Sequence, residues 1–182
     1  MPISKHDLSE TDICSMFITP AVTSAGWDLM TQLRQEVYFT DGRITVNGQI
    51  VERGEKKWAD YVLYKGDLPL AIIEAKNNTY SVGHGMQQGL EYATILDVPF
   101  VYSSNGDGFL EHDRTRIVER SLALNAFPSP AELWERYRIL KGLTPAQERV
   151  ITQPYYDQGF RPLGRVLPIS NDTPSSTLKT DT

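Results

Sequence analysis

Three residues, Asp60, Glu74 and Lys76, are of the types that hydrolyse phosphodiesters. Two carboxylates that converge attract a hard divalent cation through their oxygen atoms. Such a cation lowers the pKa of a bound water and neutralises the charge that develops on the phosphate oxygens. A lysine beside it can orient or deprotonate the attacking water, or stabilise the transition state as a point charge. The set predicts metal-assisted cleavage, provided that the fold brings the three side chains together.

Two neighbouring strands must position these residues. Alternation along residues 58–64 puts Asp60 on the same face as Val62, while Glu74 and Lys76 share a face of the following strand. A short Gly-Asp turn makes the strands antiparallel neighbours, so their register places Asp60 opposite or close to Glu74. The alternative is a cross-strand salt bridge at the end of a sheet, because short patterns of charged residues are common by chance.

A predicted helix over residues 85–97 carries a second polar pair. Gln88 and Tyr92 are four residues apart and therefore lie on one helical face. An amide and a phenol there could orient a phosphate or a catalytic side chain. The alternative is a solvent-facing glutamine beside a partly buried tyrosine.

With this pair, the pattern resembles a known superfamily. Asp60, 13 intervening residues, Glu74-Ala75-Lys76 and then Q-x-x-x-Y resemble the PD-(D/E)xK nucleases. Four stretches resemble the N-terminal nuclease domain of the restriction (R) subunit of type I restriction-modification enzymes, over roughly residues 9–159. They are SETDICSMFITPAVTSAGWD, ADYVLYKGDLPLAIIEAKN, GMQQGLEYA and NAFPSPAELWERYRILKGL.

The resemblance implies a role for each residue of the motif. Asp60 and Glu74 would be ligands of Mg²⁺, and the carbonyl of Ala75 could be the third ligand. Lys76 would be the catalytic lysine, and the Q-x-x-x-Y pair would support the site. The family often has a further acidic residue on the first helix, and Glu10 is the nearest match to it. The alternative is that Glu10 is an acid in the first turn that interacts favourably with the helix dipole. Ala59, rather than proline, precedes Asp60, a variation that this branch tolerates.

The remaining elements predict an α/β, restriction-endonuclease-like fold. Ser9 and Asp12 form a predicted capping box that begins a helix. Pro20 would bend or divide that helix, and Gly26 would end it. Asp-Gly and Asn-Gly pairs within residues 41–48 are hairpin-turn signals. Strands are expected at 37–40, 44–46, 50–51, 58–64, 70–75, 100–104 and 109–112, and helices at 85–97, 131–140 and 144–152. They predict a mixed, mainly antiparallel central sheet flanked by helices.

Composition bounds the class of protein. The 182 residues suit one nuclease domain over residues 1–160, followed by a Ser/Thr/Pro-rich tail over 161–182 that we expect to be disordered. A single cysteine, no signal peptide and no long apolar run predict a cytoplasmic protein without a membrane segment. The net charge of −5 argues against a free-standing DNA binder, but not against a nuclease delivered to DNA by other domains or subunits.

The resemblance also implies partners. In R subunits, two helicase lobes that hydrolyse ATP follow the nuclease domain, and this sequence has no G-x-x-x-x-G-K-[ST] motif. We therefore expect a fragment that holds the nuclease alone, with double-stranded DNA as substrate and the methyltransferase and specificity subunits as partners. Lys56 and Lys57, with Arg53, could contact DNA, although a solvated turn is the alternative. Two rival functions are a catalytically silent assembly module that docks a helicase or partner subunits, and a stand-alone repair nuclease or exonuclease.

Overall fold

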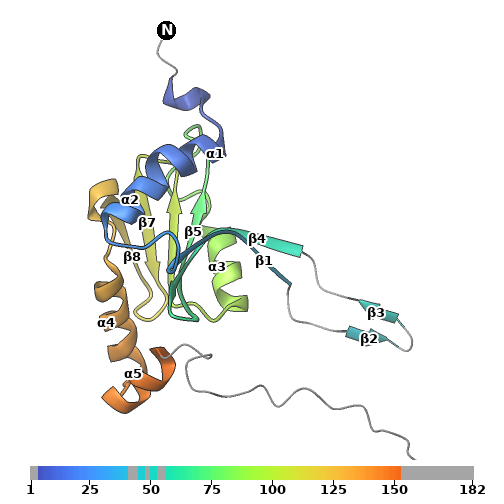
Figure 1. Ribbon diagram of the computed structural model, residues 1–182. Helices are drawn as coiled ribbons and strands as arrows, with labels where there is room; N and C mark the ends of the chain where they lie inside the picture. Colours follow the sequence, from blue (N-terminus) through green and yellow to red (C-terminus); the bar gives the residue numbers. More distant parts are fainter. Residues whose placement is uncertain (1–3, 41–44, 48–49, 53–55, 153–182) are drawn as a thin grey trace, which may run out of the picture.

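A six-stranded mixed sheet forms the centre of the computed structural model, which describes residues 4–40, 45–47, 50–52 and 56–152 (Figure 1). The strand order is β1-β4-β5-β6-β7-β8, and a separate two-stranded sheet consists of β2 and β3. All neighbouring pairs of the central sheet are antiparallel except β5 and β6, which are parallel. The prediction of a mixed, mainly antiparallel sheet in an α/β fold is therefore confirmed.

The elements follow the chain in a simple order. The strands are β1 (Leu33–Thr40), β2 (Thr45–Asn47), β3 (Ile50–Glu52), β4 (Lys56–Lys65), β5 (Leu68–Ala75), β6 (Phe100–Ser104), β7 (Gly108–Asp113) and β8 (Val118–Ala123). The α-helices are α1 (Glu10–Ile13), α2 (Thr19–Ser24), α3 (Met86–Ile95), α4 (Pro130–Lys141) and α5 (Pro145–Thr152). Short helical turns occupy Lys5–Asp7 and Leu124–Ala126, and a π-helical segment, Cys14–Ile18, joins α1 to α2.

Helices cover both faces of the sheet (Figure 1). The larger core lies on the face of α1, α2 and α4, where Ile13, Val22 and Leu133 pack against β-strand residues. The smaller core lies on the other face, beneath α3, where Ala93 packs with Ile72. Helix α3 connects β5 to β6, as a parallel strand pair requires. No helix among the described residues is long and apolar enough to cross a membrane.

The first helix confirms its predicted start and irregularity. Ser9 accepts a hydrogen bond from the Asp12 amide at 3.1 Å, and Asp12 accepts one from the Ser9 amide at 2.9 Å, which completes the capping box. The π-helical segment directly precedes α2, whose first turn contains Pro20. Proline has no N–H to donate and its ring crowds the preceding turn, so the helix widens there. Gly26, at φ +100°, follows its end.

Two strands differ from the prediction. β1 begins at Leu33, four residues earlier than expected, and β8 was not predicted. β8 is an edge strand whose residues are nearly all exposed, so it lacks the apolar alternation that identifies a half-buried strand. The predicted hairpin turns include residues outside the described part of the chain. The predicted tail over residues 161–182 lies entirely outside it. The antiparallel pairing of β2 with β3 agrees with the predicted hairpin between them.

A buried cluster of charges ties α4 to the sheet. Glu111, 1% exposed, accepts hydrogen bonds from Tyr102 at 2.7 Å, Arg120 at 2.9 Å and Arg136 at 2.8 Å. Arg136 also reaches Asp113 at 2.8 Å. Burial alone would raise the pKa of Glu111, but these hydrogen bonds hold it below its ordinary value. The Glu111 carboxylate is therefore stable as an anion only while its arginine partners are present.

Replacing Arg136 by alanine is expected to lower the free energy of unfolding by about 3–5 kcal/mol, because it removes the cation that two buried carboxylates, Glu111 and Asp113, share. Urea denaturation followed by circular dichroism would measure the loss. Arg138→Ala is the matched control, since Arg138 pairs with the exposed Glu135 on the same helix and its loss should change stability little. Equal effects of the two substitutions would show that the buried cluster contributes nothing special.

Beyond the last Tyr61–Ile73 pair, β4 separates from β5 and continues paired with β1 alone. Strands β1 and β4 therefore form a two-stranded ribbon, which extends away from the helices towards β2 and β3 in Figure 1. The β1–β4 register runs from Leu33 opposite Leu63 to Thr40 opposite Lys56. The root of this ribbon is where the predicted site residues lie.

Candidate active site

Asp60 and Glu74 occupy the next positions after the final β4–β5 pair, Tyr61 with Ile73. The sequence-based register is therefore correct. The two strands diverge at this point, and a hydrogen bond to a side chain takes the place of the backbone hydrogen bonds between them. Asp60 Oδ2 accepts this hydrogen bond, of 2.7 Å, from the amide of Ala75. The Asp60 carboxylate is thereby fixed beside the backbone of the Glu74-Ala75 segment.

Glu74 is a buried carboxylate, and neither of its oxygens has a hydrogen-bond partner among the described residues. Its exposed fraction is 0%. Helix α3 seals it through two glycines: a Cβ at Gly85 would lie 2.9 Å from Glu74 Cβ, and one at Gly89 would lie 2.6 Å from Val101 Cγ1 and 3.3 Å from Glu74 Cγ. An unpaired buried carboxylate is costly, so its presence calls for a partner that is not part of the chain.

The predicted alternation along β4 is wrong at Asp60. Ala59 and Val62, three residues apart, pack in the same core beneath α3, whereas Tyr61 packs in the other core. Regular alternation would place Ala59 and Tyr61 on one face. The irregularity coincides with Glu36, which stands opposite Asp60 on β1 and has φ +49°, a left-handed conformation that side chains rarely adopt. Asp60 consequently faces α1 rather than sharing a face with Val62.

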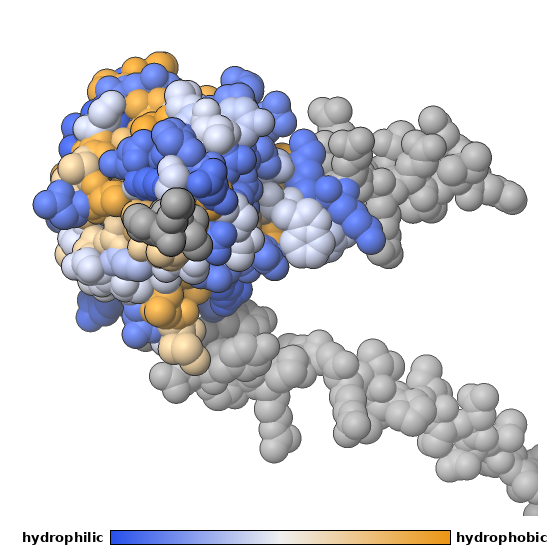
Figure 2. Space-filling model, turned by 90° about the horizontal axis from the view of Figure 1, so that it is seen from above, coloured by the Kyte–Doolittle hydropathy of each residue, from blue (hydrophilic) through white to orange (hydrophobic). Residues whose placement is uncertain are grey.

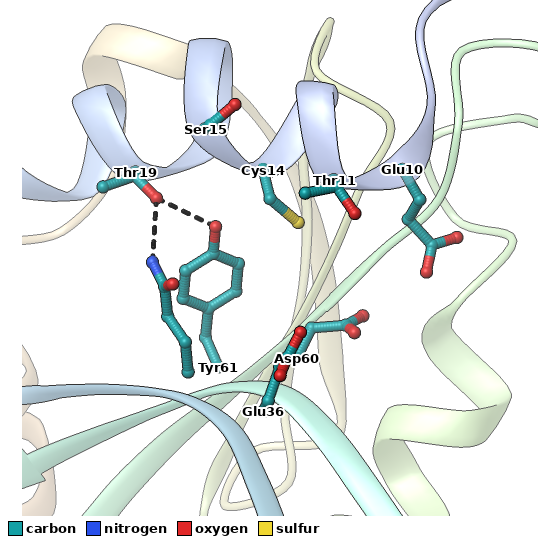
Figure 3. A pocket seen from close by; sticks show the side chains of 9 residues that line it. Glu10, Thr11, Cys14, Ser15, Thr19, Glu36, Asp60 and Tyr61 are labelled. Carbon is teal, nitrogen blue, oxygen red and sulfur yellow. Dashed lines mark hydrogen bonds between the residues drawn. The ribbon is translucent and has the colours of Figure 1, made fainter.

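A pocket of about 350 Å³ lies between this irregular part of the sheet and the first helix. Consecutive residues of both strands line it, which reflects the break in alternation. Figure 3 shows Asp60 and Glu36 below the helix, with Glu10 projecting towards them from α1. The other lining residues are Thr11, Cys14, Ser15, Thr19, Gln35 and Tyr61. Thr19 joins the walls, because its hydroxyl lies 2.9 Å from the Tyr61 hydroxyl and accepts from Gln35 at 3.3 Å.

Burial and mutual repulsion raise the pKa of every acid in this group that shows a shift. Burial, followed by the charge of Asp60, raises the pKa of Glu74 to about 9. Burial likewise raises the pKa of Asp60, against the hydrogen bond from Ala75, and burial raises the pKa of Glu10. A bound cation would counteract these shifts, because it stabilises the charged form of each carboxyl group and so favours loss of the proton.

Lys76 lies at the edge of this acidic group. Its amide donates to the Ser104 carbonyl at 2.8 Å, which anchors the end of β5 on β6. Its side chain is 17% exposed, and its Nζ lies 3.8 Å from Glu10 Oε2. The charge of Lys76 also acts on the pKa of Asp60 and Glu74 in the direction that favours their ionised forms. The structure thus brings Glu10, Asp60, Glu74 and Lys76 together.

Gln88 and Tyr92 share a face of α3, as predicted. Gln88 Nε2 donates to the Tyr92 hydroxyl at 2.9 Å. Tyr92 is buried in the core beneath α3, with its ring edge-to-face with Phe39 at 5.0 Å. Among the described residues, neither side chain makes a hydrogen bond to Asp60, Glu74 or Lys76. The pair therefore braces the helix that covers Glu74, and no polar contact ties it to the charged centre.

Sequence reasoning missed two features of the site. Glu36 was not singled out, because an isolated glutamate in a polar stretch carries no signal of a left-handed backbone. Gly85 and Gly89 are four residues apart at the start of α3, and this spacing on one helical face could have indicated a close approach to another segment.

The donors present suit a hard divalent cation such as Mg²⁺. Asp60 and Glu74 offer carboxylate oxygens and Ala75 a backbone carbonyl, which are the atoms that such cations prefer. Both oxygens of Glu74 lack hydrogen-bond partners within the described part of the chain, which leaves them available to a cation. Within the described ranges, no three histidine, cysteine or acidic side chains form a metal-binding group by themselves. The site predicted from the sequence differs from such a three-side-chain group, because it uses two carboxylates and takes its third oxygen from the backbone.

Comparisons with known proteins identify the family of the chain. Residues 7–117 match the family described as "Type I restriction enzyme R protein N terminus". The chain is 51% identical over 162 residues to the type I restriction enzyme EcoAI endonuclease subunit of Escherichia coli, a match that covers 86% of this chain and 20% of that protein. The chain therefore spans about a fifth of the length of this relative.

A solved structure has the same fold. It is a fragment structure attributed to an HsdR subunit of a type I restriction enzyme from Vibrio vulnificus YJ016, with a TM-score of 0.70 and 39% identity. The likeness covers 82% of this chain and 29% of that one. The prediction of a restriction-endonuclease-like α/β fold is therefore confirmed. The family match covers more than half of the residues, and the chain belongs to the family of type I restriction enzyme R protein N-terminal regions.

Proposed function

We propose that this chain is the metal-dependent endonuclease domain of a type I restriction R subunit and hydrolyses phosphodiester bonds of DNA. The buried, unpartnered carboxylate of Glu74, held beside Asp60 at the fork between β4 and β5, is the observation that carries the proposal. A salt bridge at a sheet end would pair its acid with a base, whereas neither oxygen of Glu74 has a partner in the part of the chain that the structure describes.

The acidic and the basic residues of the site would have different roles. Asp60, Glu74 and the carbonyl of Ala75 would hold Mg²⁺, which when bound supplies Lewis acidity to the phosphate and to a water. The ammonium group of Lys76 would orient that water or stabilise the negative charge that develops on the phosphate. Glu10 lies 3.8 Å from Lys76 and would hold it in place. Gln88 and Tyr92 would act indirectly, by fixing the helix that buries Glu74.

Partners follow from the family. We propose that this domain acts in a cytoplasmic complex in which specificity and methyltransferase subunits select the DNA site, while helicase lobes of the longer R subunit use ATP. The acidic net charge of the chain is consistent with delivery to double-stranded DNA by such partners.

Titration calorimetry with Mn²⁺ tests the metal site. We expect the 182-residue chain to bind the ion and Asp60→Ala to lose that binding, because one of two carboxylate ligands is gone. Asp67→Asn, in the exposed β4–β5 turn, is the control and should bind as the wild type does. Titrations are repeated with a DNA duplex present, because a phosphate oxygen can complete the coordination. Absence of binding under both conditions would favour the silent assembly module instead.

A further inference from the structure

We infer that the exposed aromatic pair Tyr38 and Trp58, on the ribbon beside the acidic pocket, is a stacking platform for DNA bases that flank the phosphate to be cut. This inference rests on the proposed function and extends it to residues that neither the motif nor the family match assigns. The two side chains are directly opposite in the β1–β4 register, and their ring centroids are 5.0 Å apart at an angle of 52°.

The two faces of the ribbon differ in what they contact. Phe39 and Lys57 face α3: Phe39 packs against Tyr92, and Lys57 lies 3.9 Å from Glu91. Alternation therefore places Tyr38 and Trp58 on the opposite face, the side on which Glu36 and Asp60 line the pocket. Both rings on that face are exposed: Tyr38 is 45% exposed and Trp58 is 55% exposed. In Figure 2 the described end of the ribbon projects as pale and blue atoms beside the body.

The aromatic pair lies near the place where the reacting phosphate would be held. Tyr38 and Trp58 each lie two residues along their strand from Glu36 and Asp60, a step of about 7 Å. Bases stacked in a duplex are about 3.4 Å apart along a strand, and unstacked bases are farther apart. The pair is thus within about two nucleotides of a phosphate held at Asp60. A strand whose phosphate lies at Asp60 would bring a flanking base within reach of the aromatic pair.

Chemistry favours a nucleic acid as the occupant of this face. Aromatic rings stack on every base, and they do so without sequence preference. Lys56 continues the same face beyond Trp58 and is exposed, so positive charge lies next to the rings, where a strand carries its phosphates. Rings can stack only on bases that are not already stacked within a duplex. The platform would therefore engage an unpaired or distorted segment at the cleavage point.

Tryptophan fluorescence provides a direct test, because Trp58 is the exposed one of the three tryptophans: Trp27 is 2% exposed and Trp134 is 7% exposed. A short oligo(dT) added to the 182-residue chain should quench the emission, and the quenching should vanish in Trp58→Phe. Anisotropy of a labelled oligo(dT) should show about tenfold weaker binding by Trp58→Ala and by Tyr38→Ala, the loss expected for one base stack. Trp58→Phe keeps a ring and should retain most of the affinity.

Ile139→Ala removes an equally exposed apolar side chain on α4 and should bind oligo(dT) as the wild type does. Unchanged affinity in Trp58→Ala and no quenching in the wild type would overturn the inference. Trp58 emission that is protected only when the other R-subunit domains are present, with oligo(dT) ignored, would also overturn it and assign the pair to a protein interface. Because binding is measured without cleavage, these results are independent of whether Lys76 proves catalytic.

Discussion

Replacing Lys76 by alanine is expected to lower the rate of DNA cleavage by the intact R subunit at least about a hundredfold. The ammonium group lies among Glu10, Asp60 and Glu74, where a phosphate and an attacking water would meet. Loss of its charge removes stabilisation that exists mainly in the transition state. ATP hydrolysis, which we propose for the helicase lobes of the longer R subunit, should continue, because this sequence has no G-x-x-x-x-G-K-[ST] motif.

Two measurements separate this loss from unfolding. Cleavage of supercoiled plasmid and release of phosphate from ATP are followed in the same preparation, so retained ATPase activity reports an intact enzyme. Lys141→Ala, at the exposed end of α4, is the matched control and should leave both rates unchanged. A Lys76→Ala enzyme that still cuts at more than a tenth of the wild-type rate would remove Lys76 from the mechanism.

Replacing Glu74 by glutamine is expected to stabilise the metal-free chain while abolishing cleavage. The amide cannot ionise, so the variant avoids the free-energy cost of keeping the Glu74 carboxyl protonated in the folded chain above its ordinary pKa. We expect the free energy of unfolding at pH 7 to rise by up to about 3 kcal/mol. Cleavage should fall at least about a hundredfold, because a neutral amide binds a divalent cation poorly. Urea denaturation in the presence of a chelator measures the first effect.

The raised pKa of Glu74 determines whether stability rises or falls with pH. The Glu74 pKa is about 9 when folded and 4.5 as the ordinary value, so between these limits the folded chain holds a proton that the unfolded chain has lost. Stability from this group is complete below about pH 4.5 and declines by up to about 1.4 kcal/mol per pH unit until about pH 9. Glu74→Gln should flatten this decline, whereas Asp67→Asn, in an exposed turn, should leave it. Equal slopes in wild type and Glu74→Gln would mean that Glu74 is ionised in the folded chain.

The sequence predicted the parts of the site that depend on spacing. Asp60 and Glu74 meet because a two-residue turn fixes the register of β4 and β5, and register follows from chain length and alternation. The Gln88–Tyr92 contact follows from helical periodicity alone. The ends of α3, α4 and α5 fall within about two residues of the predicted ones, in keeping with how far helix ends vary between assignments.

What could not be predicted depends on tertiary contact. The left-handed conformation of Glu36 is imposed by the sheet, since glutamate has no preference for it. That conformation turns Asp60 towards α1, which alternation along β4 does not anticipate. β8 was missed because it is exposed on an edge and its pairing with β7, rather than its own pattern, makes it a strand. Local sequence determines periodicity, whereas the neighbours of a strand decide where that periodicity breaks.

The separation of β4 from β5 has a mechanical consequence. Past Tyr61, the backbone of β4 pairs only with β1 among the described residues, and the hydrogen bond from the Ala75 amide to Asp60 is what still joins the base of the ribbon to β5. A displacement of the ribbon would therefore be transmitted to Asp60, whose carboxylate the Ala75 amide holds. If the ribbon binds DNA as inferred above, tension in that DNA would reach Asp60, the proposed metal ligand, through two residues of each strand.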